Sequence, residues 1–193
     1  MFRTKLVPAT MAAVIALGTA GVAFASSGEK ENANEISAVL NAKTSISQAV
    51  AAAEKQTGGR AMKVDVEHEK GTYLYEIKTV SKDKVSEVFV DPASGKITRT
   101  DDEGLIAKVF DKEDQAEFAK LAASPVTLST AVATAEKEIG GKAIEAAFEN
   151  EDGKMLFEVE VAKDKAVHKV MIDAASGAVV KVSAAEAGEH KED

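Results

Sequence analysis

The chain has 193 residues, and 24 lysines and arginines against 32 aspartates and glutamates give it a formal net charge of −8. This acidic balance argues against nucleic acid and anionic membranes as partners, because both attract basic surfaces. The sequence contains no cysteine, which excludes disulfides, thiol redox chemistry and cysteine-based metal sites.

The N-terminus has the pattern of a secretory signal peptide, in which a basic start precedes an apolar stretch and a cleavage site. Arg3 and Lys5 supply the charge, residues 11–24 are the apolar stretch, and Ala23-Phe24-Ala25 has the small residues at which signal peptidase cuts. This stretch is shorter than the roughly 20 residues of a membrane-spanning helix. We therefore predict that residues 1–25 are removed and that the mature chain is periplasmic or secreted, without membrane insertion. An uncleaved anchor is the alternative.

Helices are the first elements predicted after the cleavage site. Residues 26–34 lack large apolar side chains and are predicted to be a flexible leader, and residues 35–41 have the apolar spacing of a short amphipathic helix. A second helix begins at Ser45 and Gln48, which form a capping box, and ends at the Gly-Gly pair 58–59, because glycine favours the left-handed position after a helix.

Strands follow the glycines, because the apolar period changes from 3.6 to 2. Residues 62–67 and 73–78 alternate apolar and polar side chains on either side of a Lys70-Gly71 turn, and a third strand covers residues 85–90. A fourth, short strand is predicted at residues 96–100. The hairpin-length connections predict an antiparallel meander with one apolar face, on which the helix packs.

The turn before the fourth strand has a specific chemistry. Asp91 can accept hydrogen bonds from backbone N–H groups two and three residues on, and Gly95 can adopt the positive φ that closes the turn. The same pattern returns at Asp173 and Gly177, 82 residues later. We therefore predict φ > 0 at both glycines.

The whole unit is duplicated. Without a gap, 21 of the 56 positions in residues 44–99 are identical to those in residues 126–181. We assign residues 35–100 to the first repeat and residues 117–183 to the second. The residues predicted to be buried are Ile46, Val50, Ala53, Val64, Val66, Tyr75, Ile77 and Val88, with their equivalents Leu128, Val132, Ala135, Ala146, Phe148, Phe157, Val159 and Val170.

Residues 101–116 are predicted to form an acidic, helical spacer, and residues 184–193 a flexible tail. The spacer region has more apolar surface than a free linker would carry. Phe110, Phe118 and Leu121 are therefore predicted to pack on the repeats. Phe118 and Leu121 are expected against the second copy, as Ile36 and Val39 are against the first.

Three pairs of segments resemble the PepSY domain, a small module of the propeptides of thermolysin-like metallopeptidases and of many exported bacterial proteins. They are the helices SQAVAAAEKQTGGRA and STAVATAEKEIGGKA, the strands YLYEI and MLFEV, and the turns VDPASG and IDAASG. Ser94 and Ser176 stand where the family usually has threonine. The resemblance implies an α+β fold of two repeats, each a helix on a small antiparallel sheet in the order α-β-β-β-β. It also implies a non-catalytic role, often supposed to be the modulation of peptidases.

We predict no catalytic, cofactor-binding or metal-ligating residue. His68 and His168 do not fall at equivalent positions of the repeats, so they are interpreted as surface residues. The alternative is a metal site that joins one histidine, including His190 in the tail, to the neighbouring carboxylates Glu67, Glu69 or Glu189. Ser94 and Ser176 are explained by their turns, and Tyr73 and Tyr75 by the core, because Met155 and Phe157 occupy the equivalent positions.

Carboxylates two residues apart on a strand, as at Glu67/Glu69 and Glu158/Glu160, are interpreted as solvated residues rather than as a weak cation site. The chain is thus predicted to be an exported, non-enzymatic binding module without a cofactor. It holds or restrains a protein partner in the cell envelope, such as a peptidase, and does not bind nucleic acid. The alternative is a periplasmic accessory protein that binds a small ligand or a metal ion with its acidic strands or the cleft between the copies.

Overall fold

The computed structural model describes residues 27–82, 84–105, 112–151, 153–164 and 166–184. The predicted signal peptide, Phe110 and the tail from residue 185 onward, with His190, lie outside these residues.

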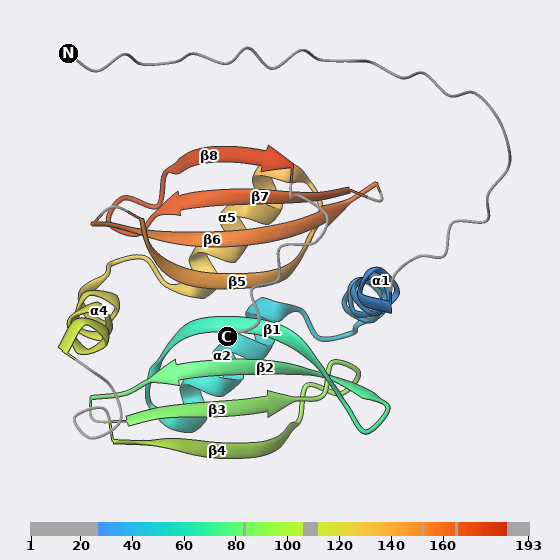
Figure 1. Ribbon diagram of the computed structural model, residues 1–193, viewed down its shortest axis with the longest axis horizontal. Coiled ribbons are helices and arrows are strands. Elements are labelled where there is room, and N and C mark those ends of the chain that lie inside the picture. Colours follow the sequence, from blue (N-terminus) through green and yellow to red (C-terminus); the bar gives the residue numbers. More distant parts are fainter. Residues whose placement is uncertain (1–26, 83, 106–111, 152, 165, 185–193) are drawn as a thin grey trace, which may run out of the picture.

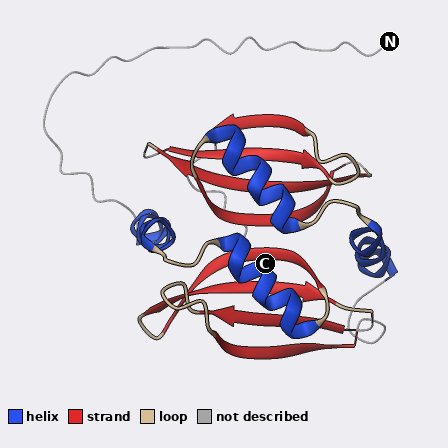
Figure 2. Cartoon of the chain, turned by 180° about the vertical axis from the view of Figure 1, so that it is seen from behind, coloured by secondary structure: helices blue, strands red, loops and turns tan. Residues whose placement is uncertain are grey.

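Each repeat contributes one helix and four strands to a single antiparallel sheet. In the first repeat α2 (Ile46–Thr57) is followed by β1 (Arg60–Glu69), β2 (Thr72–Val80), β3 (Lys84–Val90) and β4 (Ile97–Leu105). In the second repeat α5 (Leu128–Ile139) is followed by β5 (Lys142–Glu151), β6 (Lys154–Lys163), β7 (Ala166–Asp173) and β8 (Val179–Ala184). The strand order is β4-β3-β2-β1-β5-β6-β7-β8. Helices α2 and α5 lie side by side on one face of the sheet (Figure 2), which confirms the predicted α+β repeats.

The two repeats join through their first strands. β1 and β5 pair antiparallel at only two positions, Lys63 with Ala147 and Val64 with Ala146. Val64 and Ala146 are themselves equivalent residues of the repeats, so an approximate two-fold axis passes through this pair. The apolar face of the joined sheet and both helices bury one continuous core, which includes residues of both repeats.

Helices α1 (Ser27–Asn41) and α4 (Lys112–Ala123) lie at opposite ends of the β1–β5 junction (Figure 1). The burial of Phe118 and Leu121 was predicted and is confirmed, at 9% and 1% exposure. The expected pairing of helices and copies was incomplete: α1 packs on β1 as predicted but also on β5, and α4 packs on β1 of the first repeat. Contact of α4 with the second repeat is also present, because Glu117 accepts a hydrogen bond from Asn150 of β5 (2.7 Å). The reason for this shared packing is the short junction, because β1 and β5 separate beyond it and leave apolar side chains at both ends for the helices to cover.

A basic residue at the start of each first strand reaches across to the other repeat. Arg60 Nη2 donates hydrogen bonds to the carbonyl oxygens of Ser124 (3.0 Å) and Val126 (2.8 Å), just after α4. Lys142 Nζ donates to the carbonyl of Leu40 (2.8 Å), in the last turn of α1. Helix C-termini leave carbonyls without helical donors and favour cations. These contacts therefore tie each leading helix to the opposite repeat.

Two boundaries differ from the predictions. Helix α1 begins at Ser27, so the expected leader over residues 26–34 is mostly helical. Extending a helix costs little once Ile36 and Val39 anchor it, because propagation is far easier than nucleation. β4 runs to Leu105, so residues 101–105 belong to the sheet rather than to the spacer. The pairing of Asp101 and Asp102 with β3 outweighs their low strand propensity.

The local sequence signals are confirmed. Ser45 and Gln48 form the capping box, and Gly58 ends α2 at φ 67°. Gly95 and Gly177 have φ values of 70° and 72°. Asp91 Oδ1 accepts hydrogen bonds from the backbone N–H groups of residues 93 (2.7 Å) and 94 (2.8 Å), and these bonds hold its pKa below the usual range. Asp173 repeats this geometry.

The predicted register is confirmed at fifteen of the sixteen positions, which are buried. Val66 is the exception, because it is only partly buried and packs at the margin of the core. It lies in β1 beyond the two positions that pair with β5, where the strands no longer cover each other's side chains.

Candidate functional site

No described helix lies over the face of the sheet opposite α2 and α5 (Figure 1), which we call the open face. Charged and apolar side chains share it as cross-strand neighbours: Asp65 stands beside Glu76, and Glu76 beside Phe89. In the second repeat Glu158 stands beside Met171. The apolar members are buried without a covering helix, at 2% exposure for Phe89 and 3% for Met171. Long charged side chains supply the cover, since the Arg99 guanidinium carbon lies 3.7 Å from the Phe89 ring centroid.

Three carboxylates converge on the open face of the first repeat. One oxygen each of Asp65, Glu67 and Glu76 lies within 4.8 Å of the others. Lys63 Nζ lies 2.7 Å from Asp65 Oδ2, whereas Asp65 Oδ1 is buried without a hydrogen-bond partner among the described residues. Burial raises the pKa of Glu76 to about 7, with further contributions from Asp65, Glu87 and Glu67. Carboxylates this close in a partly dry setting disfavour each other's ionised form.

The other open-face acids are partly matched by lysines. Lys78 Nζ lies 2.9 Å from Glu103 Oε1 and 3.5 Å from Glu87 Oε1. In the second repeat Lys169 Nζ lies 2.6 Å from Glu158 Oε1. The convergent cluster is not repeated there, because Ala147 stands at the position equivalent to Asp65. Glu149 remains, and burial together with Glu158 raises its pKa.

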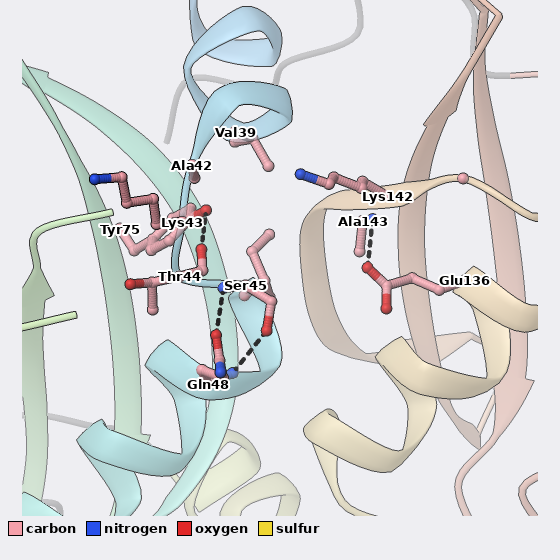
Figure 3. Close-up of a pocket in the computed structure, with 12 residues that line it drawn as sticks. Val39, Ala42, Lys43, Thr44, Ser45, Gln48, Tyr75, Glu136, Lys142 and Ala143 are labelled. Atoms are coloured by element: carbon pink, nitrogen blue, oxygen red, sulfur yellow. Dashed lines mark hydrogen bonds between the residues drawn. The ribbon is translucent and has the colours of Figure 1, made fainter. Parts of the chain in front are cut away.

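A cavity of about 340 Å³ lies between the repeats. It is bounded by the end of α1, the start of α2, Tyr75, Glu136 and the first residues of β5 (Figure 3). The Tyr75 hydroxyl donates to the Thr44 carbonyl (2.9 Å), and Glu136 Oε1 accepts from the backbone N–H of Ala143 (3.0 Å). Burial, with Glu136 nearby, raises the pKa of Tyr75 to about 12. The walls are therefore half apolar and half polar, with most hydrogen-bonding groups already engaged.

The two-fold relation explains why this cavity is present. At the equivalent place in the other half, the guanidinium of Arg60 reaches the carbonyls of Ser124 and Val126. Their counterparts are Ala42 and Thr44, and the residue equivalent to Arg60 is Lys142, whose shorter side chain bonds to Leu40 instead. The space that Arg60 fills in one half is thus left open in the other.

The two edges of the sheet differ in chemistry. In β4, Arg99 forms ion pairs with Glu69 and Asp101. Asp102 forms an ion pair with Lys84. β8 instead exposes Val180 and Val182, at 55% and 45%. An unpaired strand with exposed apolar side chains is a template for another strand, whereas charges protect an edge from such pairing.

The candidates from the sequence occupy separate places. His68 stacks on Tyr73 with ring centroids 4.5 Å apart, and His168 lies in β7 of the other repeat, opposite Val161. Glu69 pairs with Arg99 rather than joining Glu67 in the carboxylate cluster. Tyr75 is buried as predicted, while Tyr73 is only partly buried.

Sequence reasoning noted that Glu67 and Glu76 recur in the second repeat, but it did not predict that they converge with Asp65. The signal was present, because a hairpin that turns at Lys70-Gly71 pairs positions symmetric about that turn. Asp65 is opposite Glu76 and Glu67 opposite Leu74 in this register. The turn and the alternation therefore sufficed to place the three carboxylates together.

The PepSY family, described as peptidase propeptide and YPEB domain, matches residues 43–101 and 125–183. The chain belongs to the PepSY family. The two matches fall on the two repeats, each with its helix and four strands. None of the described helices is long and apolar enough to cross a membrane.

No curated protein matches the chain. One solved structure does: the crystal structure of a putative lipoprotein from Clostridium difficile 630 is similar over 75% of this chain and 95% of that chain. Its TM-score is 0.46 and its sequence identity 17%.

Proposed function

We propose that this tandem PepSY protein is an exported, non-enzymatic binding module that holds or restrains a protein partner in the cell envelope, such as a peptidase. The observation that carries the proposal is the free edge strand β8. It ends an eight-stranded antiparallel sheet and exposes Val180 and Val182, and no other described strand pairs with its outer edge. Strand addition at such an edge supplies backbone hydrogen bonds, and alternate side chains supply specificity.

The contrast between the repeats supports β8 as the docking edge. β4 and β8 are equivalent strands, but the positions of Val180 and Val182 are threonines in β4, among paired charges. The two edge strands are therefore equivalent in the fold but differ in side chains: β4 is protected by charge, whereas β8 remains apolar. An extended partner segment with apolar side chains fits β8 and is opposed at β4.

A pair of equivalent substitutions tests the proposal. Val182→Lys places a charge on the β8 edge, and Thr100→Lys places the same charge at the matching position of β4. The immobilised chain is incubated with an envelope fraction, and bound proteins are identified by mass spectrometry. We expect a peptidase or its precursor to be retained by the unmodified chain and by Thr100→Lys, and lost with Val182→Lys. An envelope fraction that yields no specific protein, or equal retention by both variants, would contradict the proposal.

The cavity between the repeats favours a second function, the binding of a small ligand by an accessory protein. Its volume, about 340 Å³, falls within the usual range of ligand pockets. A ligand bound only by the folded state raises Tm, because it stabilises that state by RT ln(1 + L/Kd), where L is the free ligand concentration. A thermal-shift screen of small metabolites and haem tests this function. A hit that disappears with Lys142→Arg, which fills the cavity, would support it, and an unmoved Tm at millimolar ligand would reject it.

A further inference from the structure

Several glutamates of the open face are identical in the two repeats, although a solvated surface would not require this. Seven strand positions of the first repeat are identical to their equivalents in the second. Three of the seven, Ala61, Val85 and Val88, are core residues. The other four alternate onto the open face: Glu67, Glu69, Leu74 and Glu76. Core positions are restricted by packing, whereas exposed strand positions usually tolerate change. The retained residues thus indicate that the open face itself has a role.

We call Asp65, Glu67, Glu76, Glu149 and Glu158 the acidic patch. Its members lie on β1, β2, β5 and β6, the four inner strands, on both sides of the β1–β5 junction. Two lysines contact the patch, Lys63 at 2.7 Å from Asp65 and Lys169 at 2.6 Å from Glu158. Five carboxylates against two lysines leave a formal charge of −3. Burial raises the pKa values of Glu67 and Glu149, and neighbouring carboxylates add to both shifts.

Apolar groups lie between these acids. Leu74 is the cross-strand neighbour of Glu67, and Leu156 is the neighbour of Glu149. Both leucines are nearly buried, at 9% and 5% exposure. A surface on which carboxylates alternate with apolar side chains suits lysine and arginine. Their methylene groups cover the apolar atoms while their charged ends reach the carboxylates.

We propose that the open face docks a basic segment of the protein partner, whose lysine or arginine side chains reach the acidic patch on both repeats. The inference rests on the proposed function in one respect, that the chain holds a protein partner, but not on strand addition at β8. Charge complementarity identifies the partner's chemistry, since an acidic patch attracts a basic surface and sets its orientation.

A single divalent cation explains less of the arrangement. It would be held by Asp65, Glu67 and Glu76, which converge within 4.8 Å. That cluster exists in one repeat only, because Ala147 replaces Asp65 in the other. Glu67 and Glu76, by contrast, recur as Glu149 and Glu158. An extended polycationic segment can reach these retained acids on both repeats, whereas one ion uses only those of the first repeat.

Calorimetric titration with a short peptide that alternates lysine and alanine tests the proposal on the purified chain. The test variant, Glu67→Gln with Glu149→Gln, removes two exposed, repeat-related carboxylates. The control variant, Glu138→Gln with Asp164→Asn, removes two exposed carboxylates outside the acidic patch, so both variants have the same net charge. We expect about fivefold to tenfold weaker binding for the test variant and less than about a twofold change for the control. Thermal unfolding of both variants verifies that they are folded.

Equal loss in the two variants would show attraction to net charge alone and would overturn the proposal. Saturable binding of calcium chloride that Asp65→Asn abolishes, combined with peptide binding unaffected by the test variant, would overturn it in favour of an ion site. Retention of the envelope partner separates this inference from the proposed function. A partner lost with Val182→Lys but retained by the Glu67→Gln/Glu149→Gln variant would leave the proposed function standing and refute docking on the open face.

Discussion

Replacing Glu76 by glutamine should stabilise the protein at alkaline pH and have little effect at acid pH. Glu76 is partly buried on the open face beside Asp65, Glu67 and Glu87, and nearby Lys78 offsets only part of their effect on its pKa. Burial and these neighbours raise its pKa from 4.5 to about 7. The folded state therefore holds this proton more tightly than the unfolded state.

The sign of the pH dependence follows from proton linkage. Below pH 4.5 the carboxyl is protonated in both states, and its contribution to folding is fully present. As the pH rises through the folded pKa of about 7, the folded protein must ionise Glu76 at a cost, and stability falls. The pKa difference alone corresponds to about 3 kcal/mol at 1.36 kcal/mol per pH unit. Because Glu76 is only half-buried, solvent screening reduces this to about 1–2 kcal/mol.

Glutamine has the shape of the protonated acid and does not ionise. Urea denaturation followed by circular dichroism at pH 5 and pH 8 should show the Glu76→Gln variant to be about 1–2 kcal/mol more stable than the parent chain at pH 8, and near it at pH 5. Glu158→Gln is the matched control, because the equivalent glutamate pairs with Lys169 at 2.6 Å and its removal should give no gain. Equal effects of Glu76→Gln at both pH values, or a loss at pH 8, would refute the reasoning.

Three further predictions concern the fold. Gly141→Ala places a Cβ 2.3 Å from the carbonyl oxygen of Ala162, so its free energy of unfolding should fall by about 3 kcal/mol or more. Gly58→Ala, where a Cβ meets nothing within 4 Å but φ is positive, should cost only about 1 kcal/mol in the same urea titration. Lys142→Arg should reach the carbonyls of Ala42 and Thr44 as Arg60 reaches those of Ser124 and Val126, and should add about 0.5–1.5 kcal/mol; Arg60→Lys should cost a similar amount. Limited proteolysis should spare residues 112–123, because Leu121 is buried against the repeats; rapid cutting there with release of two stable halves would show a loose tether.

What could be predicted from the sequence was set by local chemistry. Asp91 and Gly95 define their turn through bonds within five residues, and alternation places Tyr75 and Ile77 on the apolar face. A hairpin register follows from its turn, so the convergence of Asp65 with Glu76 was also within reach. These features need only near neighbours in the chain.

The way in which the two repeats pack together could not be predicted from the sequence. β1 and β5 each have an apolar face whether they end a sheet or join one, so alternation does not reveal their pairing. The burial of Leu121 could be predicted from its spacing, but the contact of α4 with β1 of the first repeat could not. The cavity depends on Lys142 standing where its counterpart is Arg60, because an ammonium takes the place of the larger guanidinium.

The approximate two-fold axis through Val64 and Ala146 makes the chain equivalent to an isologous homodimer whose protomers share one polypeptide. In a true homodimer every substitution appears twice, so a change that improves one surface must be tolerated at its symmetric mate. Joining the protomers removes that restriction. One edge of the sheet can stay apolar while the other becomes charged, and one half can keep a cavity that the other fills. The shared core holds both halves in place while their surfaces diverge.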